Sequence, residues 1–151
     1  MVKLLWGVIV KKICFVCHGN ICRSPMAEFI LKDKVNKLGL KDYVIVSRAT
    51  SSEEIGNDMH RGTKRMLDLN KIPYTKHYAK RLCETDYNEY DYFICMDENN
   101  VRNIKYIFNK HDKIIKLLDR DVRDPWYTGN FEETYDDIVM GIDKLLKMLG
   151  D

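Results

Sequence analysis

The densest group of chemically reactive side chains in this sequence lies between residues 17 and 25. The segment reads Cys17-His18-Gly19-Asn20-Ile21-Cys22-Arg23-Ser24-Pro25. Apolar residues precede it and a helical pattern follows it, so we expect a loop between a strand and a helix. The backbone N–H groups of such a loop, together with the positive end of the helix, can bind a tetrahedral oxyanion. The candidate phosphate-binding residues are therefore His18, Gly19, Asn20, Ile21, Cys22, Arg23 and Ser24.

Cys17 is the candidate nucleophile of this loop. The planar guanidinium of Arg23 can hold two phosphate oxygens at once. The same positive field favours the thiolate form of a cysteine, and the hydroxyl of Ser24 can donate a further hydrogen bond to it. Gly19 and Asn20 suit the left-handed backbone that a tight loop requires. An activated thiolate centred under a phosphate-sized cradle predicts phosphoryl transfer through a covalent intermediate.

One other interpretation of these cysteines stays open. Cys14 and Cys17 have the spacing of a redox pair or of two metal ligands. Against this, Cys14 lies in the middle of a predicted strand, where a core cysteine is common. No second pair of Cys or His residues stands at zinc spacing. A nucleotide-binding loop is excluded, because no Gly-Lys-Ser/Thr follows a glycine-rich run.

Four short apolar runs and four helical patterns must position this loop. The runs typical of strands are residues 13–16, 43–47, 92–96 and 113–118. The helical patterns cover residues 27–38, 59–70, 101–108 and 131–149, and Ser24 and Pro25 are expected to cap the first of them. Strands that alternate with helices predict a parallel α/β sheet. In such sheets ligands bind beyond the carboxyl ends of the strands.

The composition limits the class of protein. The chain has 151 residues, and 25 Lys plus Arg against 23 Asp plus Glu leave a net charge of +2, which excludes a strongly basic nucleic-acid binder. No apolar run approaches the roughly 20 residues of a membrane span, and no signal peptide is recognisable. Five cysteines are too few for a disulfide scaffold, so we expect a cytoplasmic protein. We also expect a monomer, although the sequence does not determine the oligomeric state. One domain is predicted over residues 1–151, with residues 1–10 as a short N-terminal extension.

The loop resembles the signature Val-Cys-x-Gly-Asn-Ile-Cys-Arg-Ser-Pro of the low-molecular-weight protein tyrosine phosphatases. The resemblance continues along most of the chain, at Ser47, at His77 before Ala79-Lys80-Arg81, at Cys95-Met96-Asp97 and at Asp124-Pro125-Trp126-Tyr127. It implies a three-layer domain in which helices flank a four-stranded parallel sheet, with the phosphate-binding loop after the first strand. It also implies phosphate-ester hydrolysis through a phosphocysteine, without a metal or other cofactor.

The resemblance also implies roles for individual residues. Asp124, which in isolation would be assigned to a turn, is expected to be the general acid beside Cys17 and Arg23. Side chains of a supporting network are expected to hold the loop in its anion-binding shape, and they are Asn20, Ser24, Ser47 and His77. The family often has tryptophan where this chain has Glu53. Trp126 and Tyr127 are then placed to form the opposite wall of the substrate cleft.

Cys22 lies in the same turn as Cys17. A neighbouring thiol can trap an oxidised nucleophile as a disulfide before further oxidation occurs. We therefore expect Cys22 to protect Cys17 against peroxide.

Competing functions follow from the same loop. A thiol-based arsenate reductase would need relay cysteines, for which Cys83 and the predicted core residue Cys95 are poorly placed. A protein arginine phosphatase would have a small polar residue at the position of Ile21. A phosphopeptide-binding module would need neither Cys17 nor Asp124. The sequence therefore favours hydrolysis of phosphotyrosine proteins or small aryl phosphates, including acid phosphatase activity.

Overall fold

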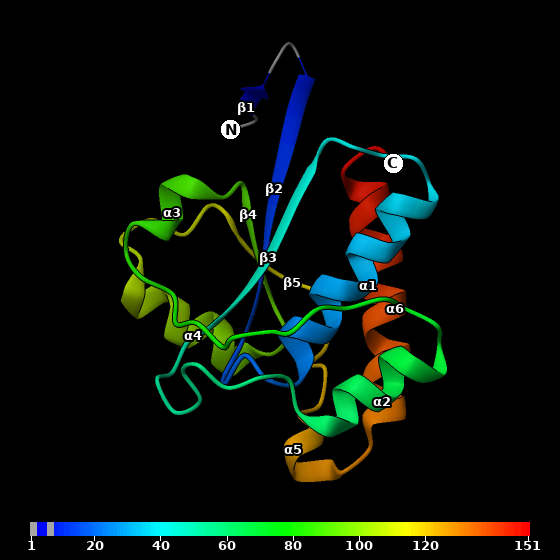
Figure 1. Cartoon of the computed structure of the whole chain (residues 1–151). Coiled ribbons are helices and arrows are strands. Elements are labelled where there is room, and N and C mark those ends of the chain that lie inside the picture. The colour runs from blue at the N-terminus through cyan, green and yellow to red at the C-terminus, as the bar shows by residue number, and fades with distance from the viewer. Residues whose placement is uncertain (1–2, 6–7) are drawn as a thin grey trace.

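A four-stranded parallel sheet forms the centre of the molecule, as predicted. The computed structural model describes residues 3–5 and 8–151. Strands β2 (Val8–Cys17), β3 (Tyr43–Ala49), β4 (Tyr92–Cys95) and β5 (Ile114–Lys116) lie in the order β3-β2-β4-β5 (Figure 1). Because β2 is central and pairs with both β3 and β4, its carboxyl end is surrounded by loops from its neighbours.

A further strand, β1 (Lys3–Leu5), was not predicted. It pairs antiparallel with the start of β2, from Lys3 opposite Val10 to Leu5 opposite Val8. Strand β2 therefore begins earlier than the expected residue 13, and its pairing with β3 starts only at Lys11. These paired residues, 3–5 and 8–10, belong to the expected N-terminal extension of residues 1–10, of which residues 1–2 and 6–7 lie outside the described part. The candidate loop follows the first parallel strand, which is the second strand of the chain.

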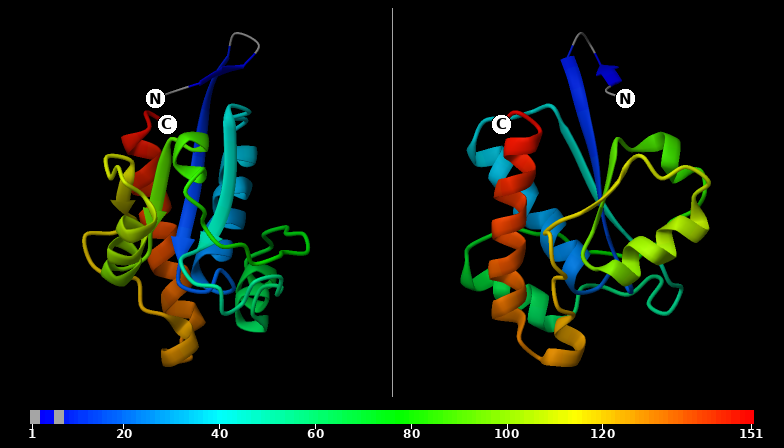
Figure 2. Two further views of the ribbon diagram at one scale, coloured as in Figure 1. Left: turned by 90° about the vertical axis from the view of Figure 1, so that its left-hand side faces the viewer. Right: turned by 180° about the vertical axis from the view of Figure 1, so that it is seen from behind.

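Helices cover both faces of the sheet, which gives the expected three layers (Figure 2). On one face lie α1 (Arg23–Lys37) and α6 (Phe131–Met148), with α2 (Arg61–Leu69) packed against both. On the other face lie α3 (Asp86–Glu89) and α4 (Glu98–Ile107). Along β2, Ile13 and Phe15 belong to the first core and Cys14 and Val16 to the second, because successive strand residues point to opposite faces. In the described residues, no helix is long and apolar enough to cross a membrane.

The start of α1 corrects the expected cap. The N-cap residue is Cys22, which makes no side-chain cap hydrogen bond, and helical residues begin at Arg23. Ser24 lies inside the first turn, where its hydroxyl contacts Cys17 and Asn20 instead of capping the helix. Two short helices, α3 and α5 (Pro125–Thr128), were also not predicted, since four residues are too few to show a helical period.

An extended segment, residues 75–81, passes beside the carboxyl end of β3 and supports the candidate loop. Arg81 forms a parallel bridge with Ala49. Asp58 fixes the segment from the other side, because its carboxylate accepts hydrogen bonds from the backbone N–H of His77 at 3.0 Å and of Met59 at 2.7 Å. The ammonium of Lys64 donates to the same carboxylate at 2.8 Å. Burial raises the pKa of Asp58, but these hydrogen bonds lower it by more, so that the pKa falls to about 2.

This shift predicts that the fold loses stability in acid. A carboxyl group with a lowered pKa in the folded protein stabilises the fold above its unfolded pKa of about 4, and this contribution is lost as the pH falls through 2. Asp58→Asn should lower the free energy of unfolding at pH 7 by about 1–2 kcal/mol. Denaturant unfolding should show the difference from wild type shrinking between pH 4 and pH 2. Asp143→Asn, which removes an exposed ion pair with Lys34, is the control and should change little. A constant Asp58→Asn difference over this range would contradict the prediction.

Candidate active site

The segment between Cys17 and Arg23 folds into a closed loop at the carboxyl end of β2. Backbone N–H groups of neighbouring segments donate to carbonyl groups of the loop and fix its position. The N–H of Thr50 donates to the carbonyl of Cys17 at 3.0 Å, and the N–H of His60 donates to that of Ile21 at 2.8 Å. Asn20 has a φ of 60°, the expected left-handed conformation, whereas Gly19, for which the same was expected, has no positive φ. The loop therefore reverses direction within five residues and delivers the chain into α1.

The sulfur of Cys17 lies at the centre of this loop. Its side chain is buried, and its Sγ atom lies 3.0 Å from Oγ of Ser24. The backbone N–H of Ser24 also points to the sulfur, at 3.4 Å. Both donors belong to the first turn of α1, whose positive end faces the thiol. Such a site stabilises a thiolate through hydrogen bonds and through the helix dipole.

The four residues expected to support the loop are joined by hydrogen bonds. The amide of Asn20 donates from Nδ2 to Ser24 Oγ at 2.7 Å and to Ser47 Oγ at 2.9 Å. Its Oδ1 accepts from the N–H of Lys80 at 3.0 Å, which fixes the amide orientation. His77 Nε2 donates to the carbonyl of Asn20 at 2.7 Å. Asn20 therefore joins the loop to β3 and to residues 75–81.

Glu28 is a member of this network that the sequence analysis missed. It lies one turn after Ser24 on α1, is only 8% exposed, and accepts a hydrogen bond from Ser47 Oγ at 2.6 Å. A signal was present, because Glu28 stands beside Ala27 and Leu31 on the face of the helix that packs against the sheet. A carboxylate on an apolar helix face requires a buried partner.

Arg23 is held by groups from two different loops, the one after β4 and the one after β5. Its guanidinium is 2% exposed, and Nη1 donates to Asp97 Oδ2 and to the carbonyl of Val122, each at 2.7 Å. Nη2 lies 3.4 Å from Asp124 Oδ2. Burial lowers the pKa of Arg23, but the thiol of Cys17 and the carboxylates of Asp97 and Asp124 raise it more. The guanidinium is therefore a fixed cation at the base of the site.

Asp124 reaches the site from the loop that follows β5. Its second carboxylate oxygen, Oδ1, accepts a hydrogen bond from the N–H of Trp126 at 3.0 Å, so Asp124 also caps α5. The cap orients the carboxyl group towards the Arg23 guanidinium. Pro125 occupies the first position of the helix, where it needs no N–H partner.

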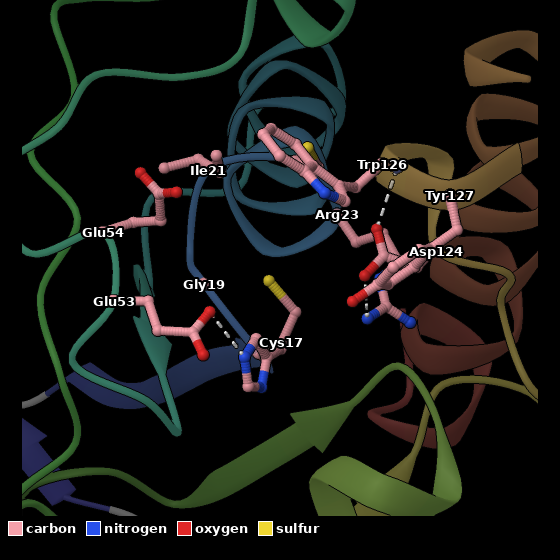
Figure 3. Close-up of a pocket in the computed structure, with 11 residues that line it drawn as sticks. Cys17, Gly19, Ile21, Arg23, Glu53, Glu54, Asp124, Trp126 and Tyr127 are labelled. Carbon is pink, nitrogen blue, oxygen red and sulfur yellow. Dashed lines mark hydrogen bonds and ion pairs between the residues drawn. The ribbon is translucent and has the colours of Figure 1, made fainter. Parts of the chain in front are cut away.

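A pocket opens above the sulfur of Cys17 (Figure 3). Glu53 and Glu54 lie on one side of it, and Trp126 and Tyr127 lie on the other. His18 Nε2 lies 3.1 Å from Glu53 Oε2 at the mouth. The remaining residues that line the pocket are Cys17, Gly19, Ile21, Cys22, Arg23 and Asp124. The sequence singled out all of these residues except Glu54, whereas Asn20, Ser24, Ser47 and His77 lie behind the loop and not in the pocket lining.

The five cysteines differ in environment. Cys14 and Cys95 are buried in the second core, while Cys83 is exposed. Cys22 borders the pocket, where burial, the neighbouring Cys17 and the Asp124 carboxylate raise its pKa to about 12. Cys22 therefore carries a protonated thiol at neutral pH. Among residues 3–5 and 8–151, no three His, Cys, Asp or Glu side chains form a group that could hold a metal ion.

Comparison with known proteins identifies the family. The family model for low molecular weight phosphotyrosine protein phosphatases matches residues 12–151. The low molecular weight protein-tyrosine-phosphatase PtpA of Staphylococcus aureus is 39% identical over 141 residues, which cover 89% of this chain and 90% of the relative. The crystal structure of SP-PTP, a phosphatase from Streptococcus pyogenes, is 44% identical, with a TM-score of 0.86 and 93% of each chain covered. The structure of YfkJ from Bacillus subtilis is 36% identical, with a TM-score of 0.90, and covers 93% of this chain and 95% of that one. This chain belongs to the low molecular weight phosphotyrosine protein phosphatases, enzymes that hydrolyse phosphotyrosine with a cysteine.

Proposed function

We propose that Cys17, Arg23 and Asp124 carry out the hydrolysis in two steps. In the first, the Cys17 thiolate attacks phosphorus, the S–P bond forms and the P–O bond to the tyrosine breaks. Asp124 gives its proton to the departing phenolate oxygen. In the second step water attacks the phosphocysteine, Asp124 accepts a proton from it, and phosphate leaves as the thiolate is restored. The observation that carries this proposal is that a buried sulfur, a guanidinium and a carboxylate meet in one pocket.

The loop and Arg23 stabilise the charge of the transferred phosphoryl group in this proposal. The backbone N–H groups of residues 18–23 can donate to its equatorial oxygens, and the guanidinium of Arg23 can hold two of them. Arg23 is already fixed by Asp97 and the carbonyl of Val122. Little reorganisation is therefore needed when phosphate enters, which is how positioning lowers the barrier of phosphoryl transfer.

The wider setting of the enzyme also belongs to the proposal. We place one phosphatase domain over residues 1–151, with residues 1–10 as a short N-terminal extension. All five cysteines are free thiols, which supports activity in a reducing compartment such as the cytoplasm. We also propose that the enzyme acts as a monomer.

The general-acid role of Asp124 predicts a loss that depends on the leaving group. Asp124→Ala should lower kcat for phosphotyrosine by about 10²–10⁴, because the phenolate must then leave without a proton. For p-nitrophenyl phosphate, whose leaving group is stable as an anion, the loss should be smaller. Steady-state kinetics with both esters measure the difference. An equal loss for both would remove Asp124 from this role.

Cys17→Ser is the companion variant. It should abolish turnover of both esters while vanadate or phosphate still binds, because the loop amides and Arg23 remain. Oxyanion binding by Cys17→Ser would show that the variant is folded and has lost only its nucleophile. Residual turnover by Cys17→Ser above contamination would contradict the nucleophile assignment. Thiol oxidation by the wild-type enzyme that depends on arsenate would favour an arsenate reductase.

The walls of the pocket support a preference for aryl phosphates with basic neighbours. Trp126 is 57% exposed and Tyr127 is 83% exposed, so both offer aromatic surface to a phenyl ring, worth about 0.5–1.5 kcal/mol beyond burial. The sulfur of Cys17 lies below this rim. A phosphoserine side chain is too short to bring its phosphate down to the sulfur. On the opposite side the carboxylates of Glu53 and Glu54 attract basic flanking residues and repel acidic ones.

Glu53→Gln tests this preference. At low salt, phosphotyrosine peptides with Lys or Arg beside the target should have a kcat/KM several-fold higher than acidic peptides, and Glu53→Gln should narrow the ratio. The ratio should also fall as salt is added, because the rim is exposed to solvent. Faster cleavage of acidic peptides, or equal cleavage of phosphoserine, would refute this description of the cleft.

Cys22 is proposed to protect Cys17 from irreversible oxidation. Peroxide converts the thiolate of Cys17 to a sulfenic acid, and attack by the Cys22 sulfur forms a disulfide and releases water. Peroxide inactivation should therefore be reversed by dithiothreitol, and in Cys22→Ser it should become largely irreversible. Recovery of activity measures this, and unchanged recovery in Cys22→Ser would exclude the protective role.

A further inference from the structure

The carboxylate of Glu28 is a buried acidic group beside the site that the proposed reaction does not use. It lies behind the loop and does not line the pocket. Its Oε1 accepts from Ser47 Oγ at 2.6 Å. Its Oε2 accepts from Lys32 Nζ, also at 2.6 Å, and the Lys32 side chain is 45% exposed. One carboxylate oxygen therefore faces the solvent side, whereas the other faces the hydrogen bonds behind Cys17.

The direction of each hydrogen bond behind Cys17 follows from its neighbours. The N–H of Lys80 donates to Asn20 Oδ1, so the Asn20 amide must donate from Nδ2. Nδ2 has two hydrogens, and they reach Ser24 Oγ and Ser47 Oγ. The hydrogen of Ser47 is directed to Glu28 and away from Asn20, so the Ser47 oxygen presents a lone pair to Nδ2. Ser24, whose oxygen accepts the other, has its hydrogen left for the sulfur of Cys17.

We infer that Glu28 is a positioning residue that sets this order of hydrogen bonds and so aims the Ser24 hydroxyl at the Cys17 thiolate. A carboxylate can only accept, so it forces Ser47 to act as donor towards α1 and as acceptor towards Asn20. The Nδ2 hydrogen of Asn20 that points to Ser47 is thereby given a fixed acceptor, while the N–H of Lys80 holds the amide oxygen. Glu28 acts through three side chains without touching the sulfur. The inference rests on the proposed role of Cys17 as the reactive thiolate.

Simple electrostatics makes the opposite prediction, which allows a sharp test. A negative charge near a thiolate destabilises it, so removing Glu28 would make the thiolate form at lower pH. In our proposal, removing the Glu28 carboxylate loosens the hydrogen bond from the Ser24 hydroxyl to the Cys17 thiolate. The thiolate then forms at higher pH. The direction of the change therefore distinguishes a hydrogen-bond role from a charge effect.

The experiment measures the rate at which iodoacetamide alkylates Cys17 as a function of pH, by mass spectrometry of its peptide. A Cys83→Ser background removes the exposed thiol. In Glu28→Leu, the pH of half-maximal rate should rise by about half a unit, which is roughly threefold less thiolate below that pH. Glu28→Gln, which keeps an acceptor oxygen but loses the charge, should retain most of the wild-type profile.

Two control variants and a second variant that interrupts the same hydrogen bonds complete the test. Asp33→Asn removes another carboxylate of α1 that pairs with a lysine four residues later, and Lys32→Gln removes the cation next to Glu28. Neither should move the alkylation profile. Ser47→Ala cuts the same chain of hydrogen bonds at its next link and should raise the pH to a similar extent. Glu28→Leu with Ser47→Ala should add little to either single change.

Either of two results would overturn the inference. The profiles of Glu28→Leu and Ser47→Ala could stay at the wild-type pH, or both Glu28 variants could move to lower pH as electrostatics predicts. If Glu28→Leu does not fold, Ser47→Ala and Glu28→Gln still decide between these outcomes. Alkylation reports on the sulfur without any phosphate turnover, so the result is independent of whether the Asp124→Ala and Cys17→Ser kinetics support the proposed function.

Discussion

Asn20 carries the constraint on which the rest of the site depends. With a φ of 60°, it turns the loop so that its carbonyl meets His77 and its side chain meets Ser24, Ser47 and the backbone of Lys80. These partners come from α1, from β3 and from residues 75–81. The loop is therefore clamped from behind, where no substrate enters, and its front face is left to the pocket. Because Asn20 is fully buried, any partner that it lost would not be replaced by bulk water.

Arg23 shows how the same fold manages a buried cation. Two carboxylates and one backbone carbonyl surround the guanidinium, so its charge is compensated before an anion arrives. The loop that follows β4 supplies Asp97, and the loop after β5 supplies Val122 and Asp124. The parallel order of the strands brings both loops to the same edge of the sheet as Cys17. The strand order therefore positions Arg23, whereas the hydrogen bonds of Asn20 position the loop around the Cys17 thiol.

Much of this arrangement could be predicted from the sequence, for identifiable reasons. The long helices and the parallel strands have strong apolar patterns, and the loop residues have side chains suited to binding an anion. Strand β1, the four-residue helices and Glu28 were missed. The pairing of β1 depends on a hairpin that leaves no periodic signal, and α5 depends on a cap by Asp124 rather than on a helical stripe. Glu28 acquires its role only through Ser47, which lies 19 residues away in sequence.

The spread of these partners along the chain has a consequence for synthesis on the ribosome. Cys17 emerges early, but Ser47, His77, Asp97 and Asp124 follow it in that order, and each closes a separate part of the site. Until β3 and residues 75–81 have docked, the nascent chain lacks the Ser47 and His77 contacts that hold Asn20. Arg23 receives its last counter-charge only when the region before α6 has been translated. The full set of these contacts around Cys17 and Arg23 therefore exists only after the chain has been made as far as Asp124.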